Sequence, residues 1–155
     1  MRLFDINLRQ RYWSRDLIVE SLELADVLKL NDEELPVVSK LFGWVGDESD
    51  QMRQLAARYE LKAVAFTKGA RGSLLLVGWE LVSRPGSKLT IVDTVGAGDS
   101  YTAALAMGLL AGEEPDRILA AAHCIADFVC TQPGAMPRVP PQVLERMLKR
   151  GSVTS

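Results

Sequence analysis

Short apolar or alternating runs recur along the 155-residue chain and predict β-strands. The six runs are LFDI at 3–6, DVLKL at 26–30, AVAFT at 63–67, SLLLV at 73–77, WELVS at 79–83 and LTIVD at 89–93. A single glycine, Gly78, stands between the fourth run and the fifth. That spacing favours a β-hairpin.

Helical patterns lie between and after these runs, at 14–25, 32–42, 48–59, 98–111, 115–130 and 141–150. Strand and helix alternate through the first half of the chain, which is typical of βαβ units and a covered, parallel sheet. The sequence therefore predicts an α/β fold with a mainly parallel sheet, flanking helices and one β-hairpin.

Composition and charge narrow the class of partner. Hydrophobic residues make up 48% of the chain and charged residues 25%, which is ordinary for a globular protein. The formal net charge of −2 gives no basic footprint for a nucleic acid. The start lacks the apolar core of a signal peptide, and the longest small-apolar run is too short to cross a bilayer. We expect a cytoplasmic protein that binds neither nucleic acid nor membrane.

The segment DTVGAGDSYTAAL at 93–105 carries the densest chemistry in the chain. A predicted strand ends at Asp93, and a predicted helix begins near Gly98. Gly96 and Gly98 carry no Cβ atom, so backbone amides at the helix N-terminus are accessible to an anion. Asp99 lies in the first turn, where the helix dipole favours an ionised carboxylate. The alternative is structural: Asp99 caps the helix and the glycines turn the chain.

This segment resembles the second signature of the ribokinase-like (PfkB) carbohydrate kinases, D-T-x-G-A-G-D followed by a helix of small residues. In that family the last aspartate takes the proton of the sugar hydroxyl that attacks the γ-phosphate of ATP. The Gly-Ala-Gly amides hold the charge on the phosphoryl group. The resemblance implies that Asp99 is the base and that Gly96, Ala97, Gly98 and the Asp99 amide form the anion hole. It also implies ATP and Mg²⁺ as cofactors and a ribokinase-like three-layer fold.

Two further stretches resemble nucleotide-site motifs of the family. LKLNDEEL resembles N-x-x-E, which implies that Asn31 and Glu34 lie near the triphosphate and that Glu34 contacts Mg²⁺ indirectly. The same spacing is that of a capping box, which needs no metal. AFTKGARGSLLL resembles T-x-G-x-x-G, which implies that Thr67, Gly69 and Gly72 line the nucleotide site. A plain turn would also account for those glycines.

The late segment AAAHCIADFVCTQPGAMPRVP resembles the family's last long helix and the loop after it. His123 stands where the family often has an asparagine beside the adenine. A packing role is the alternative for a lone histidine in an alanine-rich helix. Gly134, together with Asp93, falls in a loop region that binds a monovalent cation such as K⁺ in some members.

The opening FDINLRQRYW resembles the D-x-N-x-R-x-x-x-W stretch of fructokinase and 2-keto-3-deoxygluconate kinase members. Asp5, Asn7 and Arg9 leave the first strand on alternating positions, so we expect them to point to one side. The resemblance implies that Arg9 contacts the substrate or the transferring phosphate. An ion-paired loop at the strand end is the alternative.

The resemblance covers residues 3–149 but only the second half of the family's usual length. We expect residues 1–150 to form the nucleotide-binding and catalytic half of a kinase domain, and 151–155 a flexible tail. The resemblance implies that the half that supplies most sugar contacts in the family is not in this sequence. The first strand should then expose a sheet edge, which favours a homo-oligomer or association with the missing N-terminal half.

Two functional hypotheses follow from this. The first is an ATP-dependent, fructokinase-like carbohydrate kinase that binds a nucleotide and a small sugar. The second is a nucleotide-binding or assembly module that is inactive alone because the sugar-binding half is missing.

Overall fold

The structure, a computed structural model, describes residues 1–149 and forms two compact units that meet between Val82 and Ser83. Each unit is described by itself. The flexible tail expected at 151–155 lies outside the described residues, as does Arg150.

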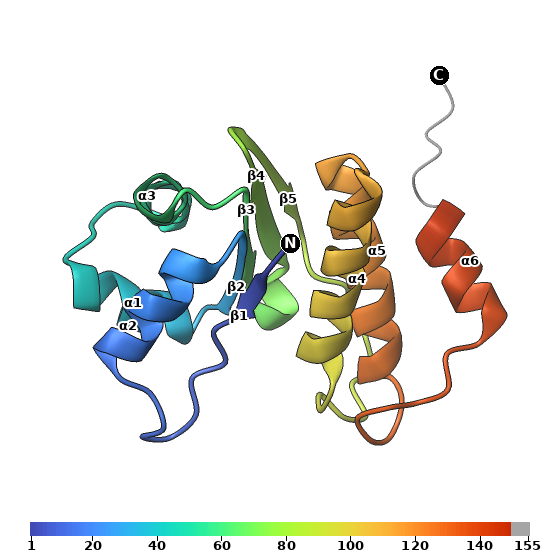
Figure 1. Ribbon diagram of the computed structural model, residues 1–155. Helices are drawn as coiled ribbons and strands as arrows, with labels where there is room; N and C mark the ends of the chain where they lie inside the picture. Colours follow the sequence, from blue (N-terminus) through green and yellow to red (C-terminus); the bar gives the residue numbers. More distant parts are fainter. Residues whose placement is uncertain (150–155) are drawn as a thin grey trace. The chain divides into compact units, whose positions relative to one another are not determined.

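The first unit is built on a five-stranded sheet in the order β1-β2-β3-β4-β5 (Figure 1). The first three strands are parallel, β3 and β4 are antiparallel, and a two-residue turn at Gly78 and Trp79 joins β4 to β5. The predicted hairpin is therefore confirmed, and the sheet is parallel on one side and antiparallel on the other. The strands are β1 (Leu3–Asp5), β2 (Val27–Asn31), β3 (Ala63–Thr67), β4 (Ser73–Val77) and β5 (Glu80–Arg84).

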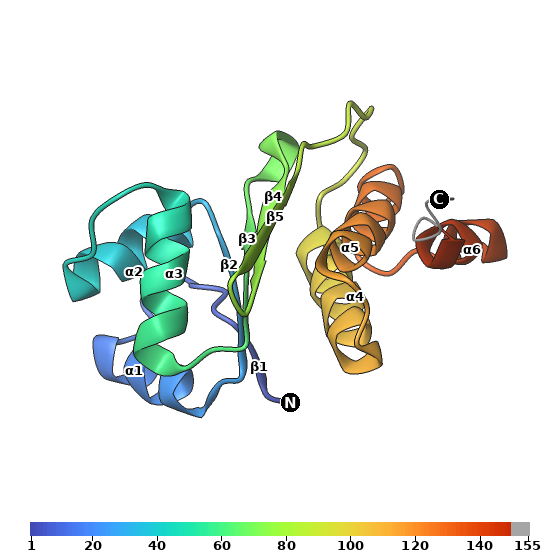
Figure 2. The same ribbon diagram turned by 90° about the horizontal axis from the view of Figure 1, so that it is seen from above.

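Three helices, α1 (Arg15–Leu24), α2 (Glu34–Phe42) and α3 (Glu48–Tyr59), cover one face of this sheet (Figure 2). Ser14 caps α1 by accepting a hydrogen bond from the Leu17 amide, and Asp47 opens α3 with a capping box. Alternate strand residues face these helices and form the core with them. The core includes Leu28, Leu30, Val64, Phe66 and Leu76 from the strands and Ile18, Leu22, Val38, Met52 and Leu55 from the helices.

The intervening strand residues are buried as well. Val27, Ala63, Ala65 and Leu75 are each at most 2% exposed, although they point to the opposite face. Burial on both faces explains why the sequence shows nearly continuous apolar runs in β2, β3 and β4 instead of strict alternation.

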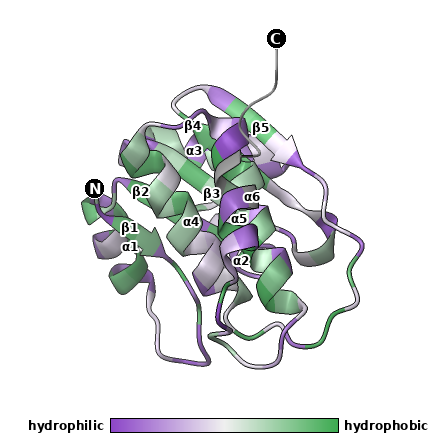
Figure 3. Ribbon diagram, turned by 90° about the vertical axis from the view of Figure 1, so that its right-hand side faces the viewer, coloured by the Kyte–Doolittle hydropathy of each residue, from purple (hydrophilic) through white to green (hydrophobic). Residues whose placement is uncertain are grey.

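The described part of the second unit contains three helices, with α4 (Ala97–Ala111) beside α5 (Pro115–Cys130) and α6 (Pro141–Lys149) beside α5 (Figures 1 and 2). A Cβ atom on Gly108 of α4 would lie 2.8 Å from the Ile118 side chain of α5, so this crossing requires a residue without one. Few strongly hydrophilic positions occur along α4 (Figure 3). No helix among the described residues has both the length and the apolar character needed to cross a membrane.

The run at 89–93 is not a strand, contrary to the prediction from its apolar pattern. The amides of Val92 and Asp93 both donate to the Cys130 carbonyl at the end of α5, at 2.9 and 3.3 Å. A strand needs a neighbouring strand to satisfy its backbone, and the helix end takes that place here. Ile91 and Val92 stay more than half exposed.

The two leucines near the end of α1 test the position of the first core. Leu22 is 0% exposed and Leu24 is 60% exposed. We expect Leu22→Ala to lower the free energy of unfolding by about 2–5 kcal/mol, because it removes buried methyl groups and leaves a cavity. Leu24→Ala should change it by less than about 0.5 kcal/mol.

The measurement is urea unfolding followed by tryptophan fluorescence, because Trp13, Trp44 and Trp79 all lie in the first unit. Equal effects of the two substitutions would mean that the α1 face packed on the sheet is assigned wrongly.

Candidate functional site

The carboxyl ends of β1, β2 and β3 meet at one edge of the sheet in the first unit. Asn31 and Thr67 are register partners at the last positions of their strands, and Asp5 is the register partner of Lys29. Each strand leads into a turn that carries residues singled out from the sequence. Ligands of open α/β sheets bind beyond the carboxyl ends of the strands. The fold therefore gathers one group of the predicted residues at a suitable edge.

The turn from β2 to α2 is closed by reciprocal hydrogen bonds between Asn31 and Glu34. Asn31 Oδ1 accepts from the amides of Glu33 and Glu34, both at 2.9 Å. Glu34 Oε2 accepts from the Asn31 amide at 2.8 Å. This is the geometry of a capping box, so the structural alternative for N-x-x-E describes the contacts that these side chains make.

Glu34 makes a second bond that a cap does not need. Its Oε1 accepts from the Leu8 amide in the loop after β1, at 2.9 Å. The side chain is buried, with the residue 5% exposed. Burial raises the pKa of the Glu34 carboxyl above its ordinary value, and the two amides and the nearby Lys29 lower it by less.

The residues of this turn fit Mg²⁺ only in an indirect role. Both Glu34 oxygens and the Asn31 side-chain oxygen already accept from backbone amides. Among the residues that the structure describes, no group of three or more histidine, cysteine, aspartate or glutamate side chains could hold a metal ion. Mg²⁺ keeps several waters and is commonly bound through substrate phosphates plus one or two carboxylates. The indirect role assigned to Glu34 from the sequence stays a prediction.

The loop after β1 departs from the expected strand geometry. The strand ends at Asp5, and Asn7 and Gln10 have φ values of +42° and +47°. The alternation expected to place Asp5, Asn7 and Arg9 on one side therefore stops at Asp5. Asp5 Oδ1 instead lies 3.2 Å from the ammonium group of the buried Lys29. Arg9 is exposed, and no ion pair holds it within the described chain, so the ion-paired alternative describes Asp5 but not Arg9.

The turn from β3 to β4 contains Gly69 and Gly72. Gly72 has φ +100° and ψ −150°, which is a conformation that glycine alone adopts readily. Within the described chain, Thr67 Oγ1 makes only a long 3.5 Å contact to the Leu30 carbonyl. Lys68 pairs with Glu48 at 2.8 Å, so its ammonium group is already engaged by an acid.

Arg71 pairs with Asp32 at 2.9 Å and joins this turn to the one after β2. The turns that follow β2 and β3 are thus tied together at the same sheet edge.

The second group of predicted residues lies in the second unit, in the loop before α4. Asp93 accepts from the amides of Val95 and Gly134 at 3.0 and 3.1 Å. These bonds, the Val95 bond first, lower the pKa of the Asp93 carboxyl. Gly96 is the N-cap of α4 with φ +82°, and a Cβ atom there would lie 2.1 Å from the Ala135 carbonyl oxygen. Two contacts therefore fix this loop against residues 134–135.

The start of α4 leaves two amides and one carboxylate available. The Ala97 amide donates to the Thr94 carbonyl at 3.2 Å, whereas the amides of Gly98 and Asp99 have no acceptor within residues 1–149. The Asp99 side chain is exposed and accepts no hydrogen bond from that part of the chain, so it does not cap the helix. Free amides at a helix N-terminus attract anions, and the first-turn carboxylate lies beside them.

His123 lies in α5, where it is buried with the residue 8% exposed. Its ring meets the Tyr101 ring edge to face, with centroids 6.0 Å apart. Burial lowers the pKa of the His123 imidazole, which favours the neutral form at pH 7. These contacts agree with the packing role, and the predicted place beside an adenine stays a prediction. The cation site predicted from Asp93 and Gly134 likewise stays a prediction, and both residues are joined by a hydrogen bond here.

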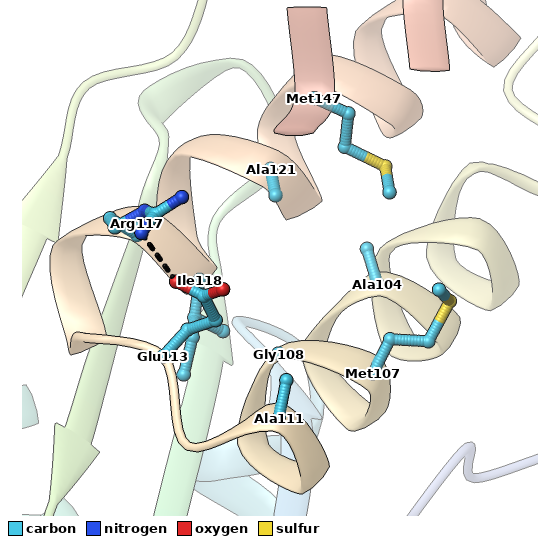
Figure 4. Close-up of a pocket in the computed structure, with 9 residues that line it drawn as sticks. All are labelled: Ala104, Met107, Gly108, Ala111, Glu113, Arg117, Ile118, Ala121 and Met147. Atoms are coloured by element: carbon cyan, nitrogen blue, oxygen red, sulfur yellow. Dashed lines mark ion pairs between the residues drawn. The ribbon is translucent and has the colours of Figure 1, made fainter. Parts of the chain in front are cut away.

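Sequence reasoning missed a small apolar pocket between the helices of the second unit (Figure 4). Its volume is about 140 Å³, and the Glu113–Arg117 ion pair of 2.8 Å stands at its wall. The lining residues are Ala104, Met107, Gly108, Ala111, Glu113, Arg117, Ile118, Ala121 and Met147. None of them is a predicted site residue, and no motif in the sequence marks such a pocket.

The close approach of Gly96 to Ala135 gives a prediction for the loop. We expect Gly96→Ala to lower the free energy of unfolding by about 3 kcal/mol, because the new methyl group combines an unfavourable positive φ with a backbone clash. Gly112→Ala is the matched control, since Gly112 also has a positive φ, +67°, but nothing lies within 4 Å of its Cβ position. It should cost only about 1 kcal/mol.

The measurement is urea unfolding followed by far-ultraviolet circular dichroism, which reports the loss of all helices, α4 to α6 included. A Gly96→Ala variant no less stable than the Gly112→Ala variant would contradict the packing of Gly96 on Ala135.

Known proteins share both sequence and fold with this chain. The family model described as pfkB family carbohydrate kinase matches residues 1–142. A 2-dehydro-3-deoxygalactonokinase of Haloferax volcanii is 30% identical over 152 residues, which are 96% of this chain and 47% of that protein. A fructokinase of Klebsiella pneumoniae is 32% identical over 148 residues, covering 88% of this chain and 47% of that protein. The chain thus spans about half the length of the curated relatives it matches.

Solved structures give the same answer. Aminoimidazole riboside kinase from Salmonella enterica, complexed with aminoimidazole riboside and an ATP analogue, matches with a TM-score of 0.74 and 25% identity, over 94% of this chain and 51% of that one. A ribokinase II from E. coli in complex with ATP and Mg²⁺ matches with a TM-score of 0.72 and 21% identity, over 88% and 43%. The fold is therefore part of a ribokinase-like fold, and the chain belongs to the pfkB family of carbohydrate kinases.

Proposed function

We propose that this chain supplies the nucleotide-binding and catalytic part of an ATP-dependent kinase that phosphorylates a sugar hydroxyl, as fructokinases do. The observation that carries the proposal is the start of α4. There the amides of Gly98 and Asp99 have no acceptor within the described residues and the Asp99 carboxylate is exposed and unengaged. Membership of the pfkB family supports the reaction class.

In the proposed reaction, Asp99 acts as the base. Its carboxylate takes the proton of the sugar hydroxyl while the hydroxyl oxygen forms a bond to the γ-phosphorus. The bond from that phosphorus to the β–γ bridging oxygen breaks, and ADP leaves with the electron pair. The Gly98 and Asp99 amides stabilise the charge on the transferring phosphoryl oxygens, with Gly96 and Ala97 shaping the turn that presents them.

When bound, ATP and Mg²⁺ supply the phosphoryl group and neutralise the charge on its oxygens. Asn31, Glu34, Thr67, Gly69 and Gly72 would lie along the nucleotide, with Glu34 reaching the metal only through water. His123 would pack beside the adenine ring, and Arg9 would contact the sugar or the transferring phosphate. The proposal also includes a monovalent cation such as K⁺ near Asp93 and Gly134.

The proposed partners are a nucleotide, a small sugar and a further protein segment that completes the sugar site, supplied by an N-terminal half or by a second copy of the chain. The length of the relatives supports that segment, since the Haloferax volcanii and Klebsiella pneumoniae kinases are each about twice as long as their match to this chain. The cytoplasmic location expected from the sequence belongs to the same proposal.

The second candidate is a nucleotide-binding or assembly module that does not turn over. It is favoured by β1, which ends the sheet and, among residues 1–149, pairs with a strand on one side only. An open edge of this kind is a site for pairing with another strand. Under this hypothesis the chain binds ATP but releases no ADP by itself.

Substitution of the proposed base separates binding from chemistry. We expect Asp99→Asn to lower the rate of ADP release roughly 10²–10⁴-fold, because the amide cannot take the hydroxyl proton. The dissociation constant for Mg²⁺–ATP should change little, since the two backbone amides remain. The measurements are a coupled ADP-release assay over fructose, 2-keto-3-deoxygluconate and ribose, and calorimetry for the nucleotide.

Asp116→Asn is the control, because Asp116 occupies the first turn of α5 as Asp99 occupies that of α4. Turnover unaffected by Asp99→Asn would remove the base assignment. Nucleotide binding without turnover in the unsubstituted chain would favour the second candidate, and no binding at millimolar Mg²⁺–ATP would count against both.

A further inference from the structure

The loop after β1 contains two residues in an unfavourable backbone conformation. Asn7 has φ +42° and Gln10 has φ +47°. Asparagine adopts the left-handed region more easily than most residues, but glutamine has no such preference. Residues of this kind persist only where their surroundings hold them, and they gather at functional sites. Arg9, which is proposed to contact the substrate or the phosphate, lies between them.

A carboxylate from outside the loop binds the backbone of this segment. The amide of Leu8, between the two left-handed residues, donates to Glu34 Oε1 at 2.9 Å. The partners are 26 positions apart, so the bond joins the turn after β1 to the first turn of α2. A hydrogen bond from a backbone amide to a carboxylate is about twice as strong as one to a neutral acceptor.

Capping of α2 does not explain this bond. The cap needs only Oε2, which accepts from the Asn31 amide at 2.8 Å. The other oxygen of the same carboxylate is used for a neighbouring strand's loop, within a buried surrounding that also contains the Lys29–Asp5 pair. A buried carboxylate is stable only if donors satisfy it, and here the two donors come from different turns.

We propose that Glu34 is a positioning residue that fixes the Asn7–Gln10 segment by its Oε1 and so sets where Arg9 is presented at the carboxyl edge of the sheet. This inference rests on the proposed function only for the role of Arg9. The fastening of the loop by Glu34 is independent of it. Glu34 acts through Leu8 and does not itself touch the reacting atoms.

The fastening is tested in the ligand-free chain by NMR. The amide protons of Leu8 and Asn31 should titrate together, with one shared midpoint, because both bond to the same carboxyl. The midpoint should lie above the ordinary pKa of glutamate, since burial of Glu34 raises its pKa, with Lys29 on β2 lowering it and Asp5 on β1 raising it.

Glu34→Gln should abolish this titration and speed hydrogen exchange of the Leu8 or the Asn31 amide by about tenfold or more. The glutamine NH₂ group would face an N–H donor, so one of the two bonds is lost. Glu33→Gln is the matched control: it removes the same charge one position earlier from an exposed side chain that makes no hydrogen bond or ion pair within the described chain. It should leave both resonances unchanged.

The consequence for Arg9 is tested by a double-mutant cycle on Mg²⁺–ATP binding. If Glu34 acts by placing Arg9, then Glu34→Gln and Arg9→Ala should weaken binding by similar factors, and the double variant should be no weaker than either alone. Additive losses would overturn the positioning of Arg9 and would leave Glu34 only its proposed water-mediated role at Mg²⁺.

The outcomes separate the inference from the function on which it draws. If the pH titration and hydrogen exchange of the Leu8 and Asn31 amides are the same in the Glu34→Gln variant, the fastening is overturned, whatever the chain binds. A chain that shows the shared titration but binds no Mg²⁺–ATP would retain the fastening and lose the proposed function, together with the role given to Arg9.

Discussion

A carboxylate that leaves water needs hydrogen-bond donors in its place, and at the carboxyl edge of this sheet the donors for Glu34 are two backbone amides from two different turns. That requirement links the loop after β1 to the turn after β2. The Asp32–Arg71 pair then links the turn after β2 to the one after β3. The shape of the edge therefore depends on charged groups that connect loops, while the apolar strands beneath fix only where each loop begins.

The second unit meets the same requirement in a different environment. Asp93 also accepts from two amides, one near it in sequence and one 41 positions away. Its carboxyl is little buried, so the hydrogen bonds outweigh desolvation and lower its pKa, whereas burial outweighs them at Glu34 and raises it. Asp99 stands apart from both, because it has no such donor within the described chain. Glu34 and Asp93 thus hold loops, whereas the Asp99 carboxylate holds none in that part of the chain.

Local patterns were sufficient to predict most of the elements. The five strands of the sheet, the hairpin at Gly78 and the six helices all follow from periodicity and turn residues. The prediction of a strand at 89–93 was wrong because the same apolar pattern is compatible with any partner that accepts the segment's amides. The Cys130 carbonyl at the end of α5 is that partner. Apolar alternation indicates what a segment can do, but the neighbour decides whether it becomes a strand.

In the candidate site as well, contacts within one turn can be predicted from the sequence, whereas contacts between distant segments cannot. The N-x-x-E spacing is enough to predict the Asn31–Glu34 cap, since both partners lie within one turn. The bond from Glu34 to Leu8 and the contact of Gly96 with Ala135 join segments far apart in the sequence, and no local signal marks them. Resemblance to a family pointed to Asn31, Glu34 and Gly96 as candidate site residues, but it gave no information about which of their atoms are engaged in contacts within the chain.

The edge of the sheet at β1 is less suited to pairing with any strand than the apolar sequence of β1 alone implies. β1 has three residues, is only partly exposed and ends in Asp5, whose carboxylate turns inward to Lys29. A short edge strand with an engaged charge is a poor template for indiscriminate pairing, because few backbone groups are presented and the next residues leave the strand conformation at Asn7. A partner at this edge would therefore have to recognise the loop that follows as well as the strand. The segment held by Glu34 is then part of any surface that such a partner would meet.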